Sequence, residues 1–186
     1  MPAELLHRLG TLLCAGPEAT EALGERIGRI APAGLVIALD GELGSGKTCF
    51  VRGLARGLDV TDAVSSPTFA LQHAHQGRLE LWHFDAWRAS SGAALLQELG
   101  PAELGRGAVL AVEWAARVRE LLPPPRLEIE FLHVAEHERR LELRVRGALE
   151  PSFVTALARI LIEPGAAWRV EEAADPLEPP PDPPRR

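Results

Sequence analysis

Residues 41–48 read Gly41-Glu42-Leu43-Gly44-Ser45-Gly46-Lys47-Thr48, a full match to the phosphate-binding pattern Gly-x-x-x-x-Gly-Lys-[Ser/Thr]. Glycines let such a loop wrap closely around a polyphosphate, so that successive backbone N–H groups point at the anion. Lys47, the only lysine in the chain, would place a compact positive charge at the outer phosphates. Thr48 would offer a hydroxyl ligand to magnesium, which prefers hard oxygen ligands. The stretch therefore predicts a nucleotide site.

The segments on either side of this loop occur in the order that the motif requires. Residues 34–39 are a short apolar run typical of a buried strand. Apolar residues then recur at four-residue spacing from residue 50 to residue 58, which indicates a helix. A helix that begins near Lys47 would aim the positive end of its dipole at the phosphates. We expect it to end near Gly57, with that glycine as its C-terminal cap.

The composition limits the class of protein. A length of 186 residues with 46% hydrophobic residues fits one globular domain, which we place at residues 1–163. Six of the last eleven residues are proline, so residues 164–186 are expected to form an extended or disordered tail. A formal charge of −6 without an evident basic patch argues against tight autonomous binding of nucleic acid, because the phosphate backbone attracts cations.

The cellular compartment follows from cysteine usage and from apolar segments. The chain has two cysteines and no close-spaced metal or redox pattern, which fits a reducing compartment. It also lacks a basic region followed by a secretory apolar core, and it has no apolar run of membrane-spanning length. We therefore expect a cytoplasmic protein with no membrane contact.

The rest of the chain alternates between strand and helix patterns. We expect a first strand at residues 9–15, a helix that starts at a proline at 17–31, and a hairpin formed by 69–75 and 79–84. A helix interrupted at Gly100-Pro101 is expected at 94–104, followed by a strand buried on both faces at 108–112. An antiparallel pair with one solvent-exposed face is expected at 127–132 and 141–145, and a final helix at 152–162 with Ser152 as its N-cap.

Two acidic residues directly follow predicted strands. Asp85 ends the second strand of the hairpin, and Glu113 follows the buried strand at residues 108–112. In open α/β sheets ligands gather beyond the carboxyl ends of strands, so both carboxylates are placed to meet the metal on a bound nucleotide. The alternative is that either acid is a surface cap. The Ser66-Pro67-Thr68 segment is either a nucleotide-responsive loop or an ordinary turn.

Other polar residues admit two interpretations each. Cys49 would lie in the first turn of the helix after the loop, where it is either a reactive thiolate favoured by the dipole or a small packing residue. His73 and His75 would share a strand face, either as two metal ligands without an obvious third or as exposed polar alternation. Arg139 and Arg140 lie in a predicted turn, where they either reach the nucleotide or remain solvated.

Four motifs in register resemble the TsaE family, the small P-loop ATPase required for bacterial threonylcarbamoyladenosine modification of tRNA. They are the loop at residues 41–48, Val64-Ser65-Ser66-Pro67-Thr68-Phe69-Ala70-Leu71, His83-Phe84-Asp85-Ala86-Trp87-Arg88, and Val112-Glu113-Trp114. The resemblance covers roughly Leu12 to Arg146. Two residues depart from the family pattern: Trp87 stands where tyrosine is usual, and Cys49 stands where a second threonine is common.

The resemblance implies an α/β fold, a P-loop NTPase-like three-layer sandwich with a mixed parallel and antiparallel sheet. It implies ATP and Mg²⁺ as cofactors. Lys47, Asp85 and Glu113 would be catalytic, with Thr48 and Glu113 at the metal. Trp114 would pack beside the site. The nucleotide would be bound by Gly41, Leu43, Gly44, Ser45, Gly46, Lys47, Thr48 and Cys49, and the switch loop would comprise Ser66, Pro67 and Thr68.

The resemblance also implies protein partners, TsaB and TsaD, with tRNA engaged only indirectly through them. Family members are thought to reset that complex between turnovers. We expect weak hydrolysis by the isolated chain, because no arginine finger is obvious in its sequence. Two alternatives remain open: a small-molecule kinase, whose arginine-bearing lid could only be residues 88–105, and a nucleotide-gated assembly module in which hydrolysis is incidental.

Overall fold

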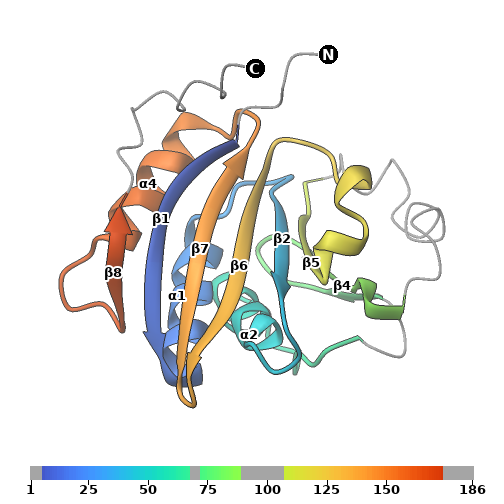
Figure 1. Ribbon diagram of the computed structural model, residues 1–186. Coiled ribbons are helices and arrows are strands. Elements are labelled where there is room, and N and C mark those ends of the chain that lie inside the picture. Colours follow the sequence, from blue (N-terminus) through green and yellow to red (C-terminus); the bar gives the residue numbers. More distant parts are fainter. Residues whose placement is uncertain (1–5, 68–71, 89–106, 174–186) are drawn as a thin grey trace, which may run out of the picture.

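A computed structural model describes residues 6–67, 72–88 and 107–173 (Figure 1). Within these ranges the strands form an eight-stranded sheet in the order β3-β4-β5-β2-β6-β7-β1-β8. Strands β4, β5, β2 and β6 run parallel, whereas β3, β7, β1 and β8 join by antiparallel pairing. The expected α/β fold with a mixed sheet is therefore confirmed.

The helices and strands follow the chain in this order: β1 (Leu6–Ala15), α1 (Gly16–Ile30), β2 (Val36–Gly41), α2 (Lys47–Gly57), β3 (Gln72–His75), β4 (Leu81–Asp85), β5 (Val109–Glu113), β6 (Arg126–Ala135), β7 (Glu138–Arg146), α4 (Pro151–Leu161) and β8 (Trp168–Ala173). Three short 3-10 helices complete the described elements: η1 (Ala86–Arg88), η2 (Ala115–Arg117) and η3 (Arg119–Leu121).

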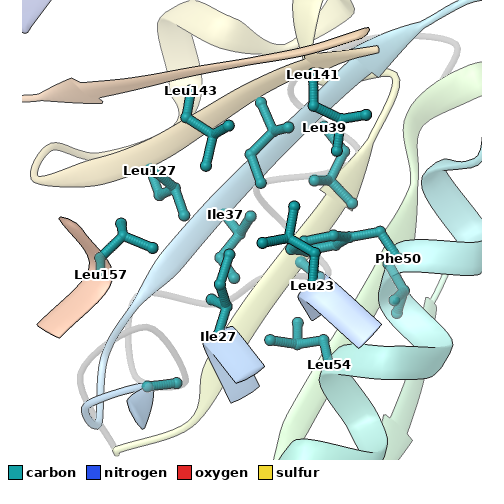
Figure 2. Close-up of a cluster of buried hydrophobic side chains, with 14 of the residues drawn as sticks. Leu23, Ile27, Ile37, Leu39, Phe50, Leu54, Leu127, Leu141, Leu143 and Leu157 are labelled. Carbon is teal, nitrogen blue, oxygen red and sulfur yellow. The ribbon is translucent and has the colours of Figure 1, made fainter. Parts of the chain in front are cut away.

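Two apolar layers flank the sheet. The larger core lies between the sheet and helices α1, α2 and α4, which cover the same face (Figures 1 and 2). On the other face a smaller cluster packs β2, β4 and β5 against the segment that carries η2 and η3. Side chains labelled in Figure 2 represent the larger core: Leu23, Ile27, Ile37, Leu39, Phe50, Leu54, Leu127, Leu141, Leu143 and Leu157.

The parallel part of the sheet determines where polar groups gather. Strand β2 is paired with β5, so Leu39 lies opposite Glu113. Strand β5 is also paired with β4, so Glu113 lies opposite Asp85. The carboxyl ends of these three strands therefore meet at one edge, where the loop after β2 also begins.

Glycines allow α1 and α2 to pack with their backbones in close contact. A Cβ atom added to Gly53 would lie 1.9 Å from the carbonyl oxygen of Glu21, and one added to Gly57 would lie 2.1 Å from that of Glu25. From the α1 side, a Cβ on Gly24 would lie 2.2 Å from the carbonyl oxygen of Phe50. Any larger residue at these positions would separate the helices. This contact fixes α2, and with it the loop that leads into the helix.

Both predicted helix caps were wrong. Gly57 is the last residue of α2 rather than its cap, and Leu58 occupies the C-cap position. Close packing on α1, rather than a left-handed turn, explains this glycine. The N-cap of α4 is Glu150, not Ser152, because Pro151 takes the first helical position, where its missing N–H costs nothing.

The predicted start of the tail at residue 164 was also wrong. Strand β8 pairs antiparallel with β1, and Trp168 is buried in the larger core. Its indole Nε1 donates to the carbonyl oxygen of Leu161 at 3.1 Å, which ties β8 to α4. The sheet therefore continues ten residues beyond the predicted domain end at 163. Residues 174–186, like the helix predicted at 94–104 and residues 68–71, lie outside the described parts of the chain.

Candidate functional site

The loop after β2 turns through three glycines in the left-handed region of backbone conformation. Gly41, Gly44 and Gly46 have φ of 143°, 74° and 108°. At Gly41 a side chain is also excluded by space, because a Cβ would lie 2.5 Å from the carbonyl oxygen of Phe131. Helix α2 starts directly after Gly46, so its free N–H groups open toward the loop. Such a loop followed by a helix N-terminus is suited to bind phosphate.

Lys47 is held against the inside of this loop. Its side-chain nitrogen donates to the carbonyl oxygens of Gly41 and Glu42, both at 2.8 Å, and lies 3.9 Å from the centre of the Trp114 ring. Burial lowers the pKa of Lys47, while the negative charges of Glu113 and two aspartates oppose that shift. The ammonium group is thus fixed in place by carbonyl oxygens and an aromatic face.

Thr48 and Glu113 are hydrogen-bonded to each other across the first turn of α2. The Thr48 hydroxyl donates to Glu113 Oε1 at 2.8 Å and is 3.0 Å from Oε2. Glu113 is buried at the end of β5, and its Oε1 also lies 2.8 Å from Nε2 of His83 in β4. A hydroxyl and a carboxylate side by side are hard oxygen donors, the set that Mg²⁺ prefers.

Asp85 connects the end of β4 to the Ser66 segment. Its Oδ2 accepts a hydrogen bond from the Ser66 hydroxyl at 2.8 Å, and its Oδ1 accepts one from the backbone N–H of Trp87 at 2.9 Å. Asp85 is buried and lines the same cavity as Glu113. The carboxylate is therefore held in a fixed orientation between the sheet and the loop that precedes β3.

Two tryptophans form one wall of the site. Trp114 follows Glu113 in the left-handed conformation, with φ of 58°, and its ring centre lies 4.5 Å from that of Trp87. Asp40 holds the turn beyond Trp114, because its carboxylate accepts hydrogen bonds from the Ala116 N–H at 2.6 Å and from Arg119 at 2.8 Å. Strand β2 thereby fixes the aromatic wall as well as the glycine loop.

These groups surround one cavity of about 520 Å³. Residues 43–49 line it from the loop and α2, together with Ser66, Asp85, Trp87, Glu113 and Trp114. Further lining comes from Arg52 of α2, from the start of α1 through Gly16, Pro17 and Thr20, and from the turn between β6 and β7 through Glu136, His137 and Arg139. The volume and the mixture of backbone donors, cations and carboxylates suit a charged small molecule.

Comparison with known proteins gives a consistent result. The model of the family described as "Threonylcarbamoyl adenosine biosynthesis protein TsaE" matches residues 14–141, more than half of the chain. The chain belongs to the TsaE family. Its sequence is 37% identical over 133 residues to the tRNA threonylcarbamoyladenosine biosynthesis protein TsaE of Bacillus subtilis, a match that covers 70% of this chain and 82% of that protein.

Other TsaE relatives match over similar spans. The TsaE protein of Treponema pallidum is 37% identical, over 66% of this chain and 90% of that protein. A crystal structure of YdiB from Bacillus subtilis superposes with a TM-score of 0.70 and 30% sequence identity, over 84% of this chain and 98% of that one. The TsaE fold and family predicted from the four motifs are therefore confirmed.

In this TsaE family member the predicted site residues lie together, with two exceptions. Gly41 is at the end of β2 and does not line the cavity, and Pro67 is buried next to Ser66 outside the lining. Thr68 lies outside the described residues, as does most of the segment at 88–105 that a kinase lid would occupy. The remaining predicted residues contribute to the cavity wall.

The residues with two open interpretations are now placed. Burial raises the pKa of the Cys49 thiol, which favours a packing role over a reactive thiolate. Arg139 lines the cavity, whereas Arg140 pairs with Glu171. His75 is buried rather than exposed, and no cluster of three potential metal ligands occurs among residues 6–67, 72–88 and 107–173.

In those same ranges no helix has the length and hydropathy needed to span a membrane.

Sequence reasoning missed two residues of this TsaE site. Asp40 is the last residue but one of β2, and a carboxylate near the end of a buried strand indicates a contact with a neighbouring loop. His83 lies two residues before Asp85, and only the pairing of β4 with β5 shows that it reaches Glu113.

Proposed function

We propose that this TsaE family member binds ATP and Mg²⁺ in the cavity and hydrolyses the ATP to drive a TsaB–TsaD type complex in tRNA threonylcarbamoyladenosine modification. One observation carries the proposal: the hydrogen-bonded pair of Thr48 and Glu113 at the N-terminus of α2, beside the amino group of Lys47. The negative charge of a polyphosphate is stabilised by two cations, here the Lys47 ammonium group and a metal ion that Thr48 and Glu113 would bind.

Each phosphate-binding role falls to a group already oriented by the fold. The loop at residues 43–46 and the first N–H groups of α2 would bind the phosphates. Lys47 would contact the outer phosphates, and because its amino group is already held by the loop, little solvation would be lost on binding. Thr48 and Glu113 would hold Mg²⁺. The ion, when bound, would neutralise charge on the phosphates during transfer to water.

Asp85 is suited to orient a water molecule toward the terminal phosphate. It lies beside Glu113 at the strand ends, and its carboxylate accepts hydrogen bonds from the Ser66 hydroxyl and from the backbone N–H of Trp87. The bond to Ser66 gives the preceding loop a direct contact with the hydrolytic side of the cavity. Hydrolysis of the nucleotide would thus alter the surroundings of the loop that carries Ser66, and a partner protein that binds this loop could respond to the change.

The isolated chain should hydrolyse ATP slowly. Among the described residues that line the cavity, the arginines have partners other than Glu113: Arg52 pairs with Glu21, and Arg139 donates to backbone carbonyls of the β6–β7 turn and, at 3.5 Å, to the carbonyl oxygen of Gly44. A partner would therefore have to supply further charge stabilisation. A net charge of −6 also leaves tRNA binding to the partners.

Calorimetric titration of ATP, with Mg²⁺ and with EDTA, tests the nucleotide site. The wild-type protein should bind ATP more tightly with Mg²⁺, and Lys47→Ala should weaken binding about tenfold or more, because a charge-assisted hydrogen bond contributes about 1.5–3 kcal/mol. Arg140→Ala is the matched control, since it removes a cation that pairs with Glu171. If ATP does not bind, or if Lys47→Ala and Arg140→Ala bind it equally, the proposed site is wrong.

A further inference from the structure

His83 is a fully buried histidine that contacts one of the proposed magnesium ligands. Its side chain has no exposed surface, and its Nε2 lies 2.8 Å from Glu113 Oε1. Strand pairing explains the contact: on β4, His83 lies opposite Ala111 of β5 and two residues before Asp85, so it faces the same side of the sheet as Glu113.

The direction of this hydrogen bond follows from chemistry. A carboxylate only accepts hydrogen bonds, so Nε2 of His83 carries the hydrogen and donates it to Glu113. The other ring nitrogen, Nδ1, is buried with no hydrogen-bond partner within the described ranges. An apolar side chain would fill this place in the sheet at a lower desolvation cost. The contact with Glu113 therefore best explains why a histidine occupies this position.

Glu113 is held from two sides that differ in their availability to a metal. Thr48 contacts it from α2, and the Thr48 hydroxyl is itself a proposed magnesium ligand. A hydroxyl that binds the ion through its oxygen can still donate its hydrogen to Glu113, so Thr48 would be shared between the ion and the carboxylate. His83 approaches from inside the sheet and is fully buried, so its bond to Oε1 can remain.

We propose that His83 is a positioning residue for Mg²⁺ binding: it fixes the Glu113 carboxylate so that the second oxygen faces the metal site. The inference rests on the proposed function. Partners that orient a metal ligand through a hydrogen bond typically change metal affinity by about 10–100-fold when they are removed.

Calorimetric titration of ATP over a series of Mg²⁺ concentrations tests this role in two variants. His83→Leu keeps an apolar volume but removes the donor, and it should raise the Mg²⁺ concentration for half-maximal enhancement of ATP binding by about tenfold or more. ATP affinity in EDTA should stay at the wild-type value. His83→Gln keeps an N–H donor and should remain within about threefold of wild type.

His75→Leu is the matched control. His75 is buried on the neighbouring strand β3, and its Nε2 also has no hydrogen-bond partner among the described residues. No contact with Glu113 is found for it, so its replacement should leave the Mg²⁺ dependence unchanged. Thermal unfolding of each variant checks that the fold is retained.

The outcomes separate this inference from the proposed function. If wild-type ATP affinity is the same with Mg²⁺ and with EDTA, both are overturned. If the wild type responds to Mg²⁺ but His83→Leu responds at the same concentrations, only the role of His83 is overturned. The role is also overturned if His83→Leu weakens ATP binding equally in EDTA, or if His83→Gln is as impaired as His83→Leu.

Discussion

Replacing Gly53 with alanine should push α1 and α2 apart and displace the glycine-rich loop at residues 41–46 that leads into α2. The added Cβ would lie 1.9 Å from the carbonyl oxygen of Glu21. Because non-bonded heavy atoms rest at about 3.5 Å, the helices would have to separate by roughly 1.5 Å. The obstructing atoms belong to the backbone, so no side-chain rotation can relieve the contact.

The expected cost follows from opposing terms. Overpacking of a core contact costs typically about 1–3 kcal/mol, and a backbone obstruction belongs at the upper end. Separation also loosens packing between α1 and α2 side chains such as Ile27 and Leu54. Alanine is a better helix former than glycine by about 1 kcal/mol, which offsets part of this. We expect the free energy of unfolding of Gly53→Ala to fall by about 3 kcal/mol.

Urea unfolding of the wild type, Gly53→Ala and Gly34→Ala measures this cost. Gly34 has a φ of 81°, but a Cβ there would meet nothing within 4 Å. Gly34→Ala therefore carries only backbone strain, about 1–2 kcal/mol. If Gly53→Ala is no more destabilising than Gly34→Ala, the close contact of the helices does not limit the fold and the reasoning is refuted.

Three further predictions concern the site, the acid limit of stability and the end of the sheet. Lys47→Ala should lose ATP affinity while its circular dichroism spectrum stays that of the wild type, because Lys47 makes its hydrogen bonds within the loop and not to a helix or to the core. Burial alone would raise the pKa of Glu128, but Arg146 and Arg126 hold it below the ordinary value of 4.5, so its contribution to stability is present above that pH and lost as the pH falls. Urea unfolding across this range should show a shallower acid loss for Glu128→Gln than for the wild type. Trp168→Ala should cost about 3–5 kcal/mol in the same assay, because a buried tryptophan is removed from the core; an unchanged midpoint would mean that β8 contributes nothing.

The glycine-rich loop at residues 41–48 and the strands around it could be predicted because each leaves a local signal. The glycine pattern, the apolar runs at β2 and β5, and the alternation in β6 and β7 each depend on neighbouring residues alone. The acids Asp85 and Glu113 were found because each follows an apolar strand, and the parallel pairing of β4 and β5 places them side by side.

Features that depend on distant segments could not be predicted. Gly24 and Gly53 lower helix propensity when considered singly, and only the packing of α1 on α2 reveals their purpose. The density of prolines near the C-terminus led to a predicted tail that began at residue 164, although β8, which contains Trp168, belongs to the sheet. His83 was noted only as the first residue of the motif at residues 83–88 and was given no role, because its contact with Glu113 exists only through strand pairing.

The most direct test of the account is phosphate release from ATP by this chain, alone and with the proposed TsaB and TsaD type partners, with tRNA modification scored over many turnovers in the same reactions. We predict slow release by the chain alone, faster release with the partners, and sustained modification only with wild-type protein and not with Lys47→Ala. If the partners change neither signal, or if Lys47→Ala supports modification as well as the wild type, then ATP hydrolysis at this cavity does not drive the complex.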